Sequence, residues 1–212
     1  MERLRLDHLV YAVPDLTAAI ASFDSALGVS PAYGGRHTGM GTHNAILPFR
    51  GDTYLELIAR DPDGTAPEHP RPFGLDTLEA PRLVTWAARS RAIEADVELA
   101  RAIGFDPGVV LAMSREEPDG TILNWKLTLN PTPRGDGLVP FLIDWGDARH
   151  PTQAASNAED VCELKSFSAE HPAPSSITAD LDALGCALQI KEANEPKLRA
   201  VLTGPNGSLS LS

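Results

Sequence analysis

The stretch GMGTHNAILPFRGDTYLEL, residues 39–57, decides how the N-terminal part of this chain folds. Two strand-like runs, Thr42 to Phe49 and Thr53 to Ala59, flank an Arg-Gly-Asp turn, a pattern typical of a β-hairpin. Side chains alternate between the two faces of a strand. We therefore expect His43 of the first run and Glu56 of the second to project from the same side of the hairpin.

A third polar side chain lies near the N-terminus, in the strand-like run LRLDHLVYAV, residues 4–13. His8 shares a strand face with apolar neighbours, so it needs a specific partner if that face is buried. Two imidazoles and one carboxylate from three strands form the ligand set of a facial metal site, which leaves coordination positions open for substrate or oxygen. The sequence predicts that His8, His43 and Glu56 bind a divalent metal ion, namely Zn, Ni, Mn or Fe.

The composition is that of a soluble globular protein. The chain has 212 residues, of which 42% are apolar and 22% charged, enough for one or two domains with a hydrophobic core. A net charge of −11 opposes binding to nucleic acid or to an anionic membrane surface. Cys162 and Cys186 form neither a zinc-finger pattern nor a disulfide framework, and no run resembles a signal peptide or a membrane span. We expect a cytoplasmic protein.

A strand and helix pattern occurs three times along the chain. The expected modules are residues 1–62, 80–148 and, less clearly, 160–212, and each contains an amphipathic helix that ends at a glycine. These glycines, at positions 28, 104 and 185, are almost evenly spaced, which indicates an internal repeat. The proline-rich run at 61–81 cannot be a core strand or a helix interior, so we interpret it as a linker.

Several of these segments together resemble the vicinal oxygen chelate superfamily, and within it the glyoxalase-like domain proteins. The matching segments are DHLVYAVPDL with the following helix and its Leu27-Gly28 end, GTHNAIL, TYLELIA and, in the second module, VPFLIDWGD. The resemblance implies an α+β fold of repeated βαβββ modules forming a curved mixed-sheet cup around a divalent metal. It implies paired modules, and we expect the first two modules to share one cup and the third, which matches only in outline, to be appended as a half-module. It also places His8, His43 and Glu56 where metal-binding members have their ligands.

A second carboxylate is a further candidate. When YLELI is superposed on FLIDW, Asp144 falls opposite Glu56, so Asp144 is a fourth ligand, a catalytic carboxylate or a surface residue. Isomerases and lyases of the superfamily need a base near the substrate carbon, a role open to Glu56 or Asp144. A dioxygenase would need Fe(II) and a further His or Tyr, for which Tyr54 and Tyr11 are candidates.

The candidates for substrate binding are Trp125, Arg115 and Tyr54. Arg36, Arg115 and Lys126 could each hold an anionic substrate, although on an acidic protein they are equally well explained as surface cations. Core packing is the default role for Trp125 and Trp145. His37 is flanked by glycines, and we interpret it as a surface residue in a mobile loop. The remaining histidines adjoin prolines and are expected to be solvated: His69, His150 and His171.

These observations favour a divalent-metal-dependent enzyme of the glyoxalase-like type that acts on a small oxygenated metabolite, as a lyase, isomerase or dioxygenase. The alternative is a metal-free protein that binds or sequesters a small molecule in the same cup. Modules of this kind often pair between chains, so a homodimer is an expected assembly. Neither nucleic acid nor a membrane is an expected partner.

Overall fold

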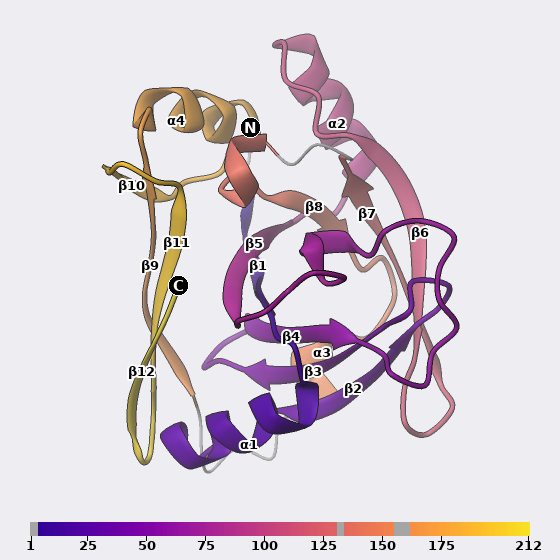
Figure 1. The fold of residues 1–212 in the computed structure, drawn as a ribbon. Coiled ribbons are helices and arrows are strands. Elements are labelled where there is room, and N and C mark those ends of the chain that lie inside the picture. Colours follow the sequence, from indigo (N-terminus) through magenta and orange to yellow (C-terminus); the bar gives the residue numbers. More distant parts are fainter. Residues whose placement is uncertain (1–3, 131–133, 155–161) are drawn as a thin grey trace.

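The computed structural model describes residues 4–130, 134–154 and 162–212 (Figure 1). Residues 1–3, 131–133, 160 and 161 of the predicted modules lie outside the described residues. The first module consists of β1 (Arg5–Ala12), α1 (Leu16–Leu27), β2 (Ala32–His37), β3 (Thr42–Pro48) and β4 (Tyr54–Arg60). Helix α1 begins at a cap in which Asp15 accepts a hydrogen bond from the Ala18 N–H at 2.9 Å, and it ends at Gly28 in the left-handed region.

The second module repeats this order and closes a barrel with the first. It consists of β5 (Arg82–Arg89), α2 (Ile93–Ala102), β6 (Val109–Glu116), β7 (Ile122–Leu129) and β8 (Phe141–Asp144). The strands follow the order β1-β4-β3-β2-β6-β7-β8-β5, and β1 pairs with β5 to complete the ring. The first two modules thus share one sheet, as expected, but the sheet is a closed barrel and not an open cup.

The C-terminal part forms a separate four-stranded sheet. Its elements are α3 (Pro151–Ala154), β9 (Glu163–His171), α4 (Pro174–Ala183), β10 (Gln189–Glu192), β11 (Lys197–Gly204) and β12 (Gly207–Leu211). The strand order is β10-β9-β11-β12, with β10 parallel to β9. In the first module it is the last strand, β4, that lies parallel to β1. The third unit therefore repeats the sequence of elements, as expected, but not the strand order of the first two.

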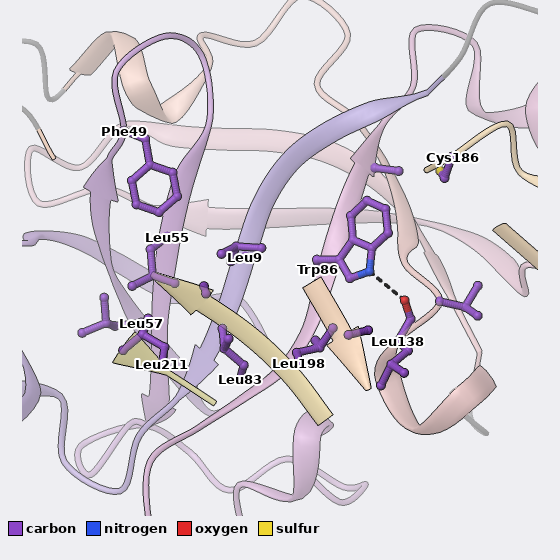
Figure 2. Close-up of a cluster of buried hydrophobic side chains, with 14 of the residues drawn as sticks. Leu9, Phe49, Leu55, Leu57, Leu83, Trp86, Leu138, Cys186, Leu198 and Leu211 are labelled. Carbon is purple, nitrogen blue, oxygen red and sulfur yellow. Dashed lines mark hydrogen bonds between the residues drawn. The ribbon is translucent and has the colours of Figure 1, made fainter. Parts of the chain in front are cut away.

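The main hydrophobic core lies on the outer face of the barrel. Figure 2 shows Leu9 of β1 and Leu83 of β5 together with Leu198 and Leu211 of the C-terminal sheet. Beside them the Trp86 indole N–H donates to the Leu138 carbonyl at 2.8 Å, which satisfies its only polar group. Each buried leucine contributes roughly 1.5–3 kcal/mol through the area it removes from water. The C-terminal sheet therefore covers the barrel wall, and the barrel interior has its own lining.

The segment between β4 and β5 is more than a linker. It contains a short 3-10 turn, η1 (Pro72–Gly74), and passes in front of the barrel in Figure 1. Leu75, directly after this turn, is buried against Val10, Ala12 and Ile58, whose strand positions face the barrel interior. The proline-rich composition excluded a strand or a helix interior, as expected, but did not prevent this segment from packing. Within the described ranges, no helix has the length and apolar character needed to cross a membrane.

Candidate active site inside the barrel

The sheet register places a set of polar side chains on the inner face of the barrel. His8 of β1 lies beside Tyr54 of β4, and Val10 lies beside Glu56, so His8, Tyr54 and Glu56 share one face. On the neighbouring strand β3, Ile46 is the partner of Glu56, which puts Asn44 on the inner face as well. These side chains are buried in a wall that is otherwise largely apolar.

The Glu56 carboxylate is the centre of this set. Its Oε1 accepts a hydrogen bond from the Asn44 amide at 2.6 Å. His37 Nε2 lies 3.6 Å from the same oxygen, and His8 Nε2 lies 3.8 Å from Oε2. These two N···O distances exceed those of protein hydrogen bonds, so the two rings border the carboxylate without being bonded to it. Glu56 is 9% exposed.

The other ring nitrogen of each histidine is held by a neighbour. His8 Nδ1 donates to the Asp7 carboxylate at 2.8 Å, and His37 Nδ1 lies 2.9 Å from the Thr42 hydroxyl. The Asn44 amide also lies 3.3 Å from His37 Nε2, which makes this nitrogen an acceptor. Burial lowers the pKa of His37, against the opposing effect of Glu56. In the tautomer that these contacts select, His37 Nε2 presents a lone pair to Glu56, while the Nδ1–H of His8 is directed at Asp7.

Asp7, which orients His8, is itself fully buried among donors. Arg89 Nε donates to it at 2.5 Å, the Trp145 indole N–H at 3.2 Å, and His150 Nε2 lies 3.3 Å away. Burial raises the pKa of Asp7, but the contacts with His150 and His8 and the positive charge of Arg89 outweigh it, so the pKa lies well below the ordinary value. Asp7 therefore stays ionised and keeps the Nδ1 proton of His8 in place.

Aromatic rings and one buried cation complete the lining. Tyr54 stacks on His8 with ring centroids 4.6 Å apart, and its pKa is raised well above 10 by burial and by the charge of Asp7. Trp125 lies 6.1 Å from the His37 ring. Arg115 donates to the Asn44 side-chain oxygen at 3.2 Å. The three predicted substrate-binding residues, Tyr54, Trp125 and Arg115, are thus brought together with His8 and Glu56.

An open recess of about 560 Å³ adjoins this cluster. It lies between the β6–β7 turn and the loop after β8, and its lining includes Glu117, Leu123, Trp145 and Arg149. Glu117 accepts from Arg115 at 3.4 Å, and the Trp145 ring lies 5.4 Å from Trp125. Two residues that line the recess, Glu117 and Trp145, therefore contact Arg115 and Trp125 of the interior cluster.

His43 does not join the cluster. It pairs with Ala59 in the β3–β4 register, which puts it on the face opposite Glu56, where its ring lies 6.0 Å from that of Tyr33. The expectation that His43 and Glu56 project from one side is therefore corrected. Among the described residues no three His, Cys, Asp or Glu side chains form a group that could hold a metal ion. The donors that are present do not fit the predicted divalent ion.

Asp144 is also separate from the interior. Phe141, three residues earlier on β8, lies against the His8 ring, so strand alternation turns Asp144 outward. There its carboxylate accepts from the Ile93 N–H at 3.3 Å, at the start of α2, and from the Gly146 N–H at 2.9 Å. Among the cations, the exposed Arg36 pairs with the buried Asp61, and Lys126 pairs with Glu94 at the surface.

Four residues of the cluster were missed by the sequence analysis or assigned to the surface: Asp7, His37, Asn44 and His150. His37 lies on β2, which the two glycines before it concealed. Asn44 lies on the same face of β3 as Thr42. The correct register of the hairpin would therefore have placed Asn44 on the inner face. Asp7 is an acidic residue inside an apolar strand, and such a residue needs a buried partner. Nothing in the sequence around His150 indicates its position beside Asp7.

The comparisons with known proteins agree with this architecture. The profile described as the glyoxalase-like domain matches residues 6–185, most of the chain. The chain belongs to the glyoxalase-like domain family. Its fold resembles that of a hypothetical protein from Staphylococcus aureus, with a TM-score of 0.69 and 15% identity over 92% of this chain and 88% of that one.

Weaker structural likenesses link this glyoxalase-like protein to methylmalonyl-CoA epimerases. The Mycobacterium tuberculosis enzyme has a TM-score of 0.45 and 22% identity, over 71% of this chain and 91% of that one. A variant of the Streptomyces coelicolor enzyme in complex with 2-nitronate-propionyl-CoA has a TM-score of 0.47 and 18% identity, over 69% of this chain and 100% of that one. No curated protein matches the sequence.

Proposed function

We propose that this glyoxalase-like protein is an enzyme that moves a proton on a small oxygenated metabolite, as an isomerase or lyase, with Glu56 as the base. The observation that carries the proposal is the position of the Glu56 carboxylate between His8 Nε2 at 3.8 Å and His37 Nε2 at 3.6 Å. A carboxylate bordered by imidazole nitrogens, one of which is an acceptor, can receive a proton from carbon and pass it on.

The proposed step is a proton abstraction next to a carbonyl group. The C–H bond breaks, its proton goes to a Glu56 oxygen, and the electron pair moves into the carbonyl as an enolate. Asn44 holds the carboxylate in position through its 2.6 Å hydrogen bond, and Asp7 fixes the ring of His8. Return of the proton to another atom of the substrate gives isomerisation, and loss of a neighbouring group gives elimination. Because the described donors do not fit a metal ion, every step uses side chains of this chain.

A second candidate is a protein that binds a small molecule in the same interior without chemistry. The buried Arg115 guanidinium favours this function, because a cation inside a barrel can hold a ligand whether or not a base acts on it. The two functions differ in one measurable property: only the enzyme exchanges the substrate's hydrogens with solvent.

The test is hydrogen exchange in D2O, followed by proton NMR on hydroxyacetone, dihydroxyacetone, pyruvate and acetoacetate. We expect the protein to accelerate exchange next to the carbonyl of at least one compound, and Glu56→Gln to slow it by roughly 10²–10⁴-fold. The Gln side chain keeps the shape and the contact with Asn44 but cannot take a proton. Exchange no faster than in buffer, or equally fast with Glu56→Gln, would refute the proposal.

A further inference from the structure

Arg115 is a buried cation whose hydrogen-bonding capacity is not filled. It lies on β6 opposite His37 of β2 and is 3% exposed. A guanidinium group has five N–H donors and a permanent positive charge. Its removal from water therefore requires hydrogen-bond acceptors for the donors and a negative charge nearby for the cation. Arg115 Nε has no hydrogen-bond partner among the described residues, although it is buried.

The contacts that Arg115 does make are weak ones. One terminal nitrogen donates to the Asn44 oxygen at 3.2 Å and the other to Glu117 at 3.4 Å. Charge-assisted bonds between a guanidinium and a carboxylate are shorter, at about 2.7–2.9 Å. Arg149 also donates to Glu117, at 3.4 Å, so two guanidinium groups share this one carboxylate.

Backbone packing holds Arg115 and Asn44 together at this place. Gly34 of β2 lies directly against them: a Cβ at this position would come 2.4 Å from the Asn44 oxygen and 2.8 Å from an Arg115 terminal nitrogen. Since Asn44 bonds both to Arg115 and to Glu56, the free Nε–H is one side chain away from the proposed base. A ligand bound to Arg115 would therefore lie beside Glu56.

We propose that Arg115 binds the carboxylate group of the ligand, so that the substrate class is small carboxylic acids with a nearby carbonyl. A carboxylate can accept from Nε and from one terminal nitrogen at once, in the planar geometry that guanidinium favours. A phosphate dianion would bring a second negative charge close to the carboxylates of Glu56 and Glu117, which disfavours it relative to a carboxylate. The carbonyl requirement rests on the proposed function, whereas the carboxylate subsite rests on Arg115 alone.

The test observes Arg115 Nε–H directly in protein labelled with 15N-arginine. Pyruvate is titrated into the protein, and pyruvamide, which has the same shape without the charge, serves as the matched ligand. We expect the Arg115 Nε–H resonance to move downfield and saturate with pyruvate and to stay in place with pyruvamide. Arg115→Lys identifies the resonance by its loss, and Arg101→Lys, at an exposed arginine of α2, is the matched control.

The outcomes separate this inference from the proposed function. Arg115→Lys should weaken pyruvate binding at least tenfold in calorimetry, whereas Arg101→Lys should leave it unchanged. Glu56→Gln should lose hydrogen exchange but still show the Arg115 shift. That shift would establish the subsite even if the wild-type protein showed no hydrogen exchange. An unmoved resonance with pyruvate, or an equal shift with pyruvamide, overturns the subsite. If Arg115→Lys does not fold, Arg115→Gln identifies the resonance in its place.

Discussion

His37 and His43, on neighbouring strands, face opposite sides of the barrel wall. His37 Nε2 lies 3.6 Å from the Glu56 carboxylate, whereas the His43 ring lies 6.0 Å from Tyr33 on the outer face. The two residues therefore form a matched pair for mutagenesis. His37→Ala should slow hydrogen exchange by about 10²-fold, because it removes an acceptor for the proton that Glu56 takes up. His43→Ala should leave the exchange rate unchanged.

The same pair tests metal binding. A thermal melt with Zn, Ni, Mn or Fe(II), and with EDTA, detects any ion that binds the native state. Because His43 faces away from Glu56, we expect His43→Ala to respond to each metal as the wild type does. A metal response that disappears with His43→Ala would mean that the β3–β4 register differs from the one described.

Asp7→Asn should destabilise the fold strongly. Asp7 is fully buried and accepts from Arg89, His8 and Trp145, so its neutralisation leaves the Arg89 charge without its buried partner. Loss of one member of a buried ion pair costs about 3–5 kcal/mol. The measurement is urea unfolding. The control is Asp52→Asn, because Asp52 also pairs with Arg89, at 2.9 Å, but is half exposed, and its loss should cost less than about 1 kcal/mol.

The pKa of His37 gives the protein a pH-dependent stability. Burial lowers this pKa from its ordinary value of 6.5, so the unfolded chain binds a proton at a higher pH than the folded chain does. The contribution of neutral His37 is complete above pH 6.5 and is lost as the pH falls from there towards the folded-state pKa. The unfolding free energy should therefore fall as the pH decreases below about 6.5, and it should fall less in His37→Gln. Equal slopes would show that His37 is not held neutral.

The hairpin shows what could be predicted from the sequence and where the prediction stopped short. Both strands and the turn are confirmed, and the Phe49 N–H donates to the Thr53 carbonyl at 2.9 Å across it. Continuing that pairing along the strands places His43 opposite Ala59, on the other face from Glu56. A shift of one residue reverses the face of every side chain, so alternation without register could not place His43.

Other parts of the site depend on contacts that a strand pattern in the sequence cannot predict. The strand β2 has glycines at positions 34 and 35, which weaken strand propensity, so the sequence predicts a loop at His37. Asp144 shares a local motif with Glu56, but the face of β8 is set by Phe141 against His8. The position of His150 beside Asp7 joins residues far apart in the chain and follows only from closure of the barrel.

The segment between β4 and β5 gives the last prediction. Leu75 is 5% exposed and packs on Val10, Ala12 and Ile58, so Leu75→Ala should lower the unfolding free energy by about 2–4 kcal/mol through the cavity it leaves. Leu99→Ala is the matched control, because Leu99 is 51% exposed on α2 and its loss should cost no more than about 0.5 kcal/mol. Urea unfolding of both variants measures the difference. If Leu75→Ala lowered the unfolding free energy as little as the control does, the segment would be a linker that leaves Val10 and Ile58 uncovered.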